Sequence, residues 1–145
     1  MNSEAKEERW LHRELDNLGK FGIQLQIYPK KKMSRSEVTD FINRLLMRIA
    51  NNCATRGADL IGHIKAHFKT ASGNIRASLV NPESGVSVES DLSSDDIESM
   101  VCIINTVVHG IWDSEVTKES MRAIKDVCRE FNSKFEIISK EGLTW

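Results

Sequence analysis

The chain has 145 residues, 40% of them hydrophobic and 28% charged, and its formal net charge is -1 at pH 7. This length can bury a hydrophobic core without disulfide bonds or structural metals, so we expect a single domain over residues 1–145. A nearly neutral chain is atypical of a protein built mainly to hold nucleic acid, which usually has a strongly basic domain. A local basic patch is still compatible with this composition.

The cysteines and the apolar stretches bear on where the protein resides. Cys53, Cys102 and Cys128 are far apart and form no CxxC pair, which favours buried thiols over a disulfide framework or a zinc site. Such thiols are typical of a reducing compartment. Residues 1–13 are charged and lack the apolar core of a signal peptide, and the stretch 100–112 is too short to span a bilayer. We therefore expect a cytoplasmic protein without a membrane partner.

Two amphipathic patterns open the chain. Residues 3–18 carry leucines at helical spacing, with Trp10 widening the apolar stripe, and predict a helix that ends at Gly19. Residues 21–28 alternate between apolar and polar side chains, which predicts a half-buried strand. Pro29 ends that strand.

The next element is a helix with clear boundaries. Ser34 and Glu37 have the spacing of a capping box, and Gly57 suits the left-handed position that follows a helix. Between them the apolar residues recur at helical spacing. The predicted inner stripe consists of Val38, Phe41, Ile42, Leu45, Ile49 and Cys53.

Three short strands are predicted next, over 60–70, 75–80 and 86–89, joined by turns rich in Gly, Pro, Asn and Ser. Short connections favour an antiparallel meander. In the first of these strands one parity is expected to face the core, namely Leu60, Gly62, Ile64, Ala66 and Phe68. The other parity is expected to face water and carries Ile61, His63, Lys65, His67 and Lys69.

The stretch 95–112 is read as a strongly apolar helix capped by the acidic run 93–96. Its apolar residues cover more than one helical face, which indicates a position in the core or at a subunit interface. Together with Trp10 this pattern predicts a homodimer. A last helix capped by Thr117 and a final strand over 134–139 complete the chain.

The expected fold class is therefore α+β, with the order α-β-α-β-β-β-α-α-β. We expect a mixed, mostly antiparallel sheet of four to five strands, with helices packed on one face and the other face open. That open face would carry the candidate site. Its predicted anion-binding residues are His63, Lys65, His67, Lys69 and Arg76.

Five potential positive charges on one sheet face attract anions such as a phosphate, a nucleic-acid backbone or an acidic protein partner. The simpler interpretation is a polar face that only keeps the sheet soluble. If these side chains share the face, like charge should lower the pKa values of His63 and His67. A secondary basic patch is predicted in the loop after the first strand, with Arg44 and Arg48 as an extension, although a solvated loop explains it equally well. The patch consists of Lys30, Lys31, Lys32 and Arg35.

Most enzyme classes find no support in the sequence. His63 and His67 are four residues apart, which on a strand separates them by roughly 13 Å, whereas two ligands of one zinc ion lie within about 4 Å of each other. No GxSxG, GxxxxGK[ST] or GxGxxG motif occurs, so no catalytic residue, metal or cofactor is assigned. An enzyme would have to use His63 or His67 as an acid-base group, with a carboxylate such as Glu89 nearby.

Two family resemblances can be stated. Residues 34–112 resemble double-stranded-RNA-binding domains in predicted layout, but the acidic run 93–96 replaces the lysine cluster of that family, so the assignment is rejected. The runs 61–66, 72–78 and 103–110 resemble the small domain that follows the GTPase domain in some CobW-type metallochaperone GTPases. This resemblance implies a detached accessory domain of such a system.

The favoured function is a small cytoplasmic, non-enzymatic binding module that uses the basic sheet face to bind an anionic ligand or an acidic protein partner. The alternatives are an RNA-binding protein, the detached accessory domain, and a small enzyme with a histidine on the sheet face. The sequence identifies no particular ligand or reaction.

Overall fold

The computed structural model describes residues 17–140. The predicted helix over 3–18 lies outside these residues, apart from its last positions. There the structure corrects the prediction, because Leu18 and Gly19 already belong to the first strand. The described elements are β1 (Leu18–Pro29), α2 (Arg35–Arg56), β2 (Leu60–Thr70), β3 (Gly73–Leu79), β4 (Ser87–Ser90), β5 (Met100–His109), α3 (Asp113–Glu130) and β6 (Ser133–Ser139).

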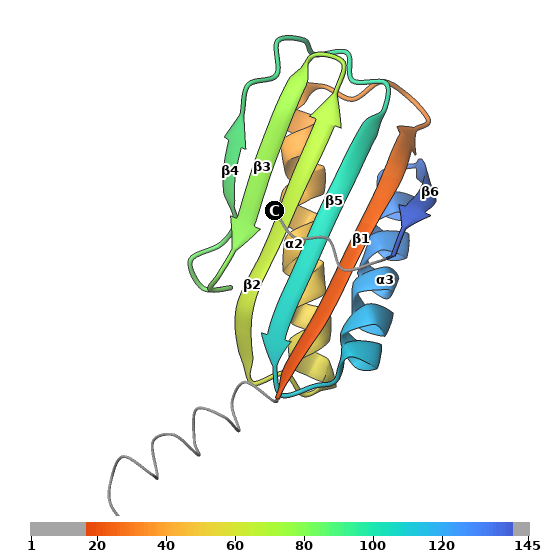
Figure 1. Cartoon of the computed structure of the whole chain (residues 1–145). Coiled ribbons are helices and arrows are strands. Elements are labelled where there is room, and N and C mark those ends of the chain that lie inside the picture. The colour runs from red at the N-terminus through yellow and green to blue at the C-terminus, as the bar shows by residue number, and fades with distance from the viewer. Residues whose placement is uncertain (1–16, 141–145) are drawn as a thin grey trace, which may run out of the picture.

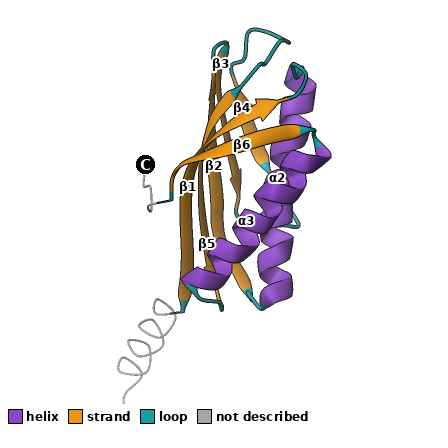
Figure 2. Cartoon of the chain, turned by 90° about the vertical axis from the view of Figure 1, so that its right-hand side faces the viewer, coloured by secondary structure: helices purple, strands orange, loops and turns teal. Residues whose placement is uncertain are grey.

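The strands form one six-stranded sheet in the order β4-β3-β2-β5-β1-β6, and every neighbouring pair is antiparallel. Figure 1 shows this sheet in front of α2 and α3, and the side view of Figure 2 shows both helices on the same face. The predicted α+β class with helices on one face is confirmed. The sheet has six strands rather than four to five, because β5 was not foreseen as a strand.

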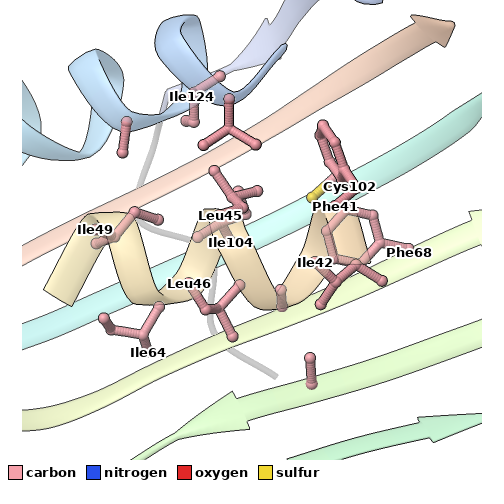
Figure 3. Close-up of a cluster of buried hydrophobic side chains, with 14 of the residues drawn as sticks. Phe41, Ile42, Leu45, Leu46, Ile49, Ile64, Phe68, Cys102, Ile104 and Ile124 are labelled. Carbon is pink, nitrogen blue, oxygen red and sulfur yellow. The ribbon is translucent and has the colours of Figure 1, made fainter. Parts of the chain in front are cut away.

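The core lies between the two helices and the inner face of the sheet (Figure 3). The predicted stripe of α2 is fully buried, and Phe41 packs edge-on against Phe68 with ring centroids 6.4 Å apart. Strand β1 adds its predicted apolar parity, from Phe21 to Ile27. Apolar side chains recur every 3.6 residues on the helix and every two residues on the strand, so both elements direct apolar side chains into the same layer.

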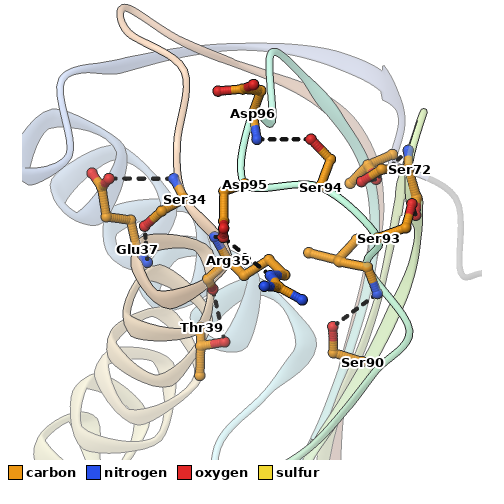
Figure 4. A network of polar contacts seen from close by, with 12 residues as sticks. Ser34, Arg35, Glu37, Thr39, Ser72, Ser90, Ser93, Ser94, Asp95 and Asp96 are labelled. Atoms are coloured by element: carbon orange, nitrogen blue, oxygen red, sulfur yellow. Dashed lines mark hydrogen bonds and ion pairs between the residues drawn. The ribbon is translucent and has the colours of Figure 1, made fainter.

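The N-terminus of α2 has the predicted capping box (Figure 4). The Glu37 N–H donates to Ser34 Oγ at 3.1 Å, and the Glu37 carboxylate accepts from the Ser34 N–H at 3.2 Å. Asp95 lies beside this helix end and accepts from Arg35 Nε at 3.0 Å. At the other end Gly57 has a φ of 128°, a conformation that suits glycine.

The predicted helix over 95–112 is wrong. Met100–His109 is strand β5, which lies between β2 and β1 at the centre of the sheet. Its burial alternates strictly: the inner parity consists of Met100, Cys102, Ile104, Thr106 and Val108, all fully buried or nearly so. The outer parity adds the apolar residues Val101, Ile103 and Val107 beside Asn105 and His109, so that the apolar residues of the run cover more than one face of a helix. A run rich in β-branched residues favours a strand. The acidic run before it is a loop and not a helix cap.

A bulge in β2 corrects the expected orientation of its first residues. The register passes from Ile61 opposite Val108 to His63 opposite Val107, so Gly62 is the extra residue. As a result Ile61 points to the core, while Leu60 is 66% exposed, which reverses the prediction for both. A Cβ on Gly62 would lie 2.9 Å from the Val107 carbonyl oxygen. Beyond the bulge, the predicted faces of β2 hold.

Helix α3 begins at Asp113, earlier than the predicted cap Thr117. The Asp113 carboxylate accepts from the Lys20 N–H at 2.8 Å, and the Glu115 carboxylate accepts from the Trp112 N–H at 3.2 Å. The helix start is thus held by carboxylates and not by a hydroxyl, and acidic groups suit a helix N-terminus. The final strand is confirmed, starting one position before its predicted first residue.

Candidate functional site

The candidate site is the sheet face opposite the helices. The strand registers place its outer side chains in cross-strand rows. One row crosses all six strands and consists of Glu89, Arg76, His67, Ile103, Gln24 and Ser139. The neighbouring rows place Lys65 between Ser78 and Asn105, and Lys69 between Asn74 and Val101. His63 lies opposite Val107. The five predicted site residues therefore share one face, on β2 and β3.

Arg76 differs from the other arginines that the structure describes. The rest form ion pairs, namely Arg35, Arg44, Arg48, Arg56, Arg122 and Arg129. Arg76 lies in register with Glu89 on β4 but forms no ion pair within residues 17–140. Lys65 and Lys69 are likewise exposed and outside the ion pairs of the described residues. These three cations are therefore available to a ligand.

Two adjoining hollows mark this part of the face. One has a volume of about 480 Å³ and is lined by outer side chains of β2, β3 and β4, including Lys65, Arg76 and Glu89. The other, of about 470 Å³, shares Arg76 and Glu89 with it and extends to Asp91. His67 lines both, and its Nε2 atom lies 3.2 Å from Asn74 Oδ1. The Asn74 amide therefore holds the imidazole at the boundary between the two hollows.

Apolar side chains along β5, called the apolar row below, lie beside these cations and were missed by the sequence prediction. Val101, Ile103 and Val107 occupy the outer parity of β5, and all three are half-buried. On its other side this row is flanked by Gln24 and Gln26 of β1. The sequence signal that could have found it is the run of β-branched residues in 100–109, with apolar residues on both parities as in strands covered on two faces.

His63 is half-buried beside Lys65. Burial lowers the pKa of the His63 imidazole below its usual value, and the positive charge of Lys65 lowers it further. Like charge on the shared face therefore acts in the predicted direction at His63, but desolvation is the larger cause. At neutral pH this side chain offers a neutral hydrogen-bonding group and not a cation.

The secondary basic patch is only partly available. Lys32 lies 3.4 Å from a Glu98 carboxylate oxygen, and Arg35 is paired with Asp95. Both carboxylates come from the loop between β4 and β5, so this half of the patch holds the loop against the start of α2 (Figure 4). Lys30 and Lys31 line a separate hollow of about 310 Å³.

Arg44 and Arg48 do not extend the patch. Arg48 Nη2 lies 2.8 Å from a Glu130 carboxylate oxygen, and Arg44 Nη1 lies 3.2 Å from the other. Arg44 also lies over the Phe131 ring, 5.3 Å from its centroid. These arginines fasten α2 to the end of α3, and the two Arg48 and Arg44 contacts hold the pKa of Glu130 below its usual value.

The geometry required for catalysis is present only in part. Glu89 and His67 line the same hollow, as an acid-base site would need, and Ser90 also lines it, but no hydrogen bond joins Ser90 to either of them among the described contacts. His109 lies at the end of β5, and its Nδ1 lies 2.6 Å from Asp59 Oδ1. Within residues 17–140, no group of three or more His, Cys, Asp or Glu side chains could hold a metal ion.

The three cysteines are free and buried, as predicted. Burial raises the pKa of Cys53 to about 11 and that of Cys128 to about 12, and it raises that of Cys102 well above its usual value. Such thiols stay protonated at neutral pH and are poor nucleophiles. They act here as small apolar side chains of the core.

No family model and no curated protein matches the chain. Among solved structures, it is similar to a hydantoinase/carbamoylase family amidase from Burkholderia ambifaria, with 9% identity and a TM-score of 0.48 over 87% of this chain and 29% of that chain. It is also similar to an amidase of the same family from Burkholderia multivorans, with 7% identity and a TM-score of 0.45 over 90% of this chain and 31% of that chain.

A third similar structure is an aminobenzoyl-glutamate utilization protein from Klebsiella pneumoniae, with 6% identity and a TM-score of 0.41 over 88% of this chain and 30% of that chain. The chain thus spans less than a third of each of these proteins. At such low identities and TM-scores the likenesses carry no argument about function. The resemblance to the small domain of CobW-type GTPases stays a prediction; its three runs fall mainly on β2, β3 and β5, which are neighbours in the sheet.

The described part of the chain contains no helix that is both long and apolar enough to cross a membrane.

Proposed function

We propose that the protein is a non-enzymatic binding module whose open sheet face binds an acidic segment of a protein partner. The observation that carries this proposal is Arg76, an exposed arginine without the ion pair that the other described arginines form. Lys65 and Lys69 lie on the same face and are also outside the described ion pairs. Three available cations beside two carboxylates, Glu89 and Asp91, favour an anionic partner.

The apolar row of β5 distinguishes a protein segment from a polynucleotide or a small ion. Val101, Ile103 and Val107 can accept apolar side chains, while the cations next to them pair with carboxylates, as in interfaces that combine an apolar centre with a polar rim. Single-stranded nucleic acids typically stack their bases on Phe, Tyr or Trp rings, and the outer side chains on β2, β3 and β5 include none of these three. RNA binding is therefore an outcome for the experiment to exclude.

The buried thiols favour a reducing compartment, and we propose the cytoplasm as the place of action. The homodimer stays a prediction, because the apolar residues of 95–112 that motivated it are divided between the inner parity of β5, which fills the core, and the half-buried outer residues Val101, Ile103 and Val107. Light scattering during size exclusion measures the oligomeric state directly.

Selection from a random dodecapeptide display library tests the proposed function. We expect the protein to enrich peptides that combine acidic and apolar residues. The double variant Lys65→Glu with Arg76→Glu should bind these peptides at least tenfold more weakly, a loss of about 1.4 kcal/mol in binding free energy. Lys118→Glu makes a matched change at an exposed lysine of α3 and should leave binding unchanged.

Enrichment of neutral or basic peptides, or equal binding by the double variant, would contradict the proposal, and so would the absence of any enrichment. RNA oligonucleotides titrated at increasing salt test the alternative. Binding that falls steeply with salt through counterion release, and is lost in the double variant, would assign the face to nucleic acid instead.

A further inference from the structure

A further hollow lies at the opposite edge of the sheet, where β1 and α3 end and β6 begins. Its volume is about 930 Å³, within the range of about 300–1,000 Å³ that small-molecule sites occupy. It shares no residue with the hollows on β2, β3 and β4. A ligand in this hollow would therefore contact none of the residues that line the hollows of the sheet face.

Four cationic residues line this hollow and no carboxylate does. The cations are Lys30, Lys125, Arg129 and Lys134. Lys125 and Arg129 lie near the C-terminus of α3, where positive charge complements the helix dipole, and Arg129 is also paired with Asp126 at 2.6 Å. Neither reason applies to Lys30 and Lys134, which come from other elements. Like charges converge from three segments, which favours an anion between them.

The rest of the lining is apolar and aromatic. Tyr28 is 42% exposed and lies opposite Lys134 in the sheet register, on the parity that faces away from the helices. Phe135 lies opposite Ile27 and is half-buried on the helix side, so the hollow extends around the edge strand β6. Cys128 also lines the hollow, and because burial raises the pKa of its thiol to about 12, it adds no negative charge. The site therefore combines ring faces with positive charge.

The rim of the hollow is held by backbone contacts. Asn132 has a φ of 50°, which turns the chain from α3 into β6. Its carbonyl accepts from the Lys30 N–H at 2.9 Å, so the loop after β1 and the turn before β6 are joined. A rim fixed by a main-chain hydrogen bond positions Lys30 relative to β6 before any ligand arrives.

We propose that this hollow binds a nucleoside monophosphate. A phosphomonoester carries a charge of about -1.5 to -2 at neutral pH. Lys30, Lys125 and Lys134 lie outside the ion pairs of the described residues and can match this charge, and Arg129, which is already paired with Asp126, can add its remaining N–H donors. The base can stack against the exposed Tyr28 ring, a contact that tolerates different bases. A free phosphate would use the charge alone and leave the aromatic part of the lining without a role.

Titration of the ¹⁵N-labelled full chain by NMR tests this inference. The probes are adenosine, guanosine, cytidine and uridine 5′-monophosphate, with adenosine and inorganic phosphate as partial ligands. We expect at least one monophosphate to shift the amide signals of residues 28–30 and 125–135. Adenosine and inorganic phosphate should each bind at least tenfold more weakly than that monophosphate.

Two variants locate the site. Lys134→Glu reverses a charge on the exposed edge strand and should weaken monophosphate binding at least tenfold, whereas Lys118→Glu on the outer surface of α3 should not. No shift with any of the four monophosphates at millimolar concentration would overturn the inference. It would also be overturned by phosphate binding as tightly as the nucleotides, by shifts confined to β2 and β3, or by unchanged binding in Lys134→Glu.

Discussion

Val107 and Val108 are neighbours on β5 that should respond very differently to truncation. Val108 is 0% exposed and lies opposite Ile61 on the inner face, whereas Val107 is half-buried on the outer face opposite His63. On a helix over 95–112 both would belong to one apolar stripe. On a strand they point to opposite sides of the sheet. Changing each to alanine therefore separates the two structures.

The magnitudes follow from burial. Val→Ala removes two methyl groups, about 0.8 kcal/mol each when buried, and a cavity term adds to this at Val108, giving about 2–3 kcal/mol of lost stability. At Val107 roughly half of the transfer term applies and no closed cavity forms, giving about 0.8 kcal/mol. The loss of strand propensity is common to both variants and cancels in their difference.

Urea unfolding of both variants measures this difference, read from the midpoints at unchanged slope. Ile104→Ala and Ile103→Ala provide a second inner and outer pair with larger side chains, for which we expect about 3–4 and about 1 kcal/mol. Equal losses within each pair, or a larger loss at the outer position, would refute the strand assignment. The outer variants should also bind the selected acidic peptides more weakly while remaining folded.

Three further predictions concern single groups. Ser34→Ala removes the capping hydroxyl of α2 and should cost about 1 kcal/mol of stability in urea unfolding, whereas Ser36→Ala, exposed in the first turn, should change little. The imidazole of His63 should titrate by NMR with a pKa below the usual value of about 6.5. The stability that the neutral imidazole supports should be complete above that pH and should decline as pH falls through the lower folded pKa. His63→Gln should flatten this decline, and a raised pKa of His63 would contradict the prediction. All three thiols should react with a thiol reagent only as fast as the protein unfolds, and rapid labelling of the native chain would show that at least one is accessible.

The sequence predicts well those elements in which periodicity and boundary signals agree. In α2 the apolar stripe, the capping box and Gly57 all indicate the same helix, and the structure confirms each. For β5 the periodicity does not distinguish a helix from a strand, because a strand with apolar residues on both parities also produces an apolar stripe at helical spacing. Length did not decide between them, since the run 95–112 includes a loop before the strand and a turn after it.

The bulge at Gly62 and the start of α3 were missed for a different reason. A bulge is specified by pairing with a neighbouring strand, here with Val107 and Val108, and the sequence of β2 alone contains no trace of that register. The start of α3 depends on Asp113 reaching the backbone of β1, a contact between residues far apart in the sequence.

The composition of the candidate site follows from strand order and not from any one strand. His67 and Arg76 could be placed on one face from their own alternation, but the apolar row next to them comes from β5, which enters the sheet between β2 and β1. A sheet in simple chain order would have left β2 beside β1, with Gln24 and Gln26 next to the cations and no apolar neighbour. Because the crossover places Val101 and Ile103 there, the face offers apolar and cationic groups within adjacent rows. That combination favours a partner that brings both carboxylates and apolar side chains over one that brings charge alone.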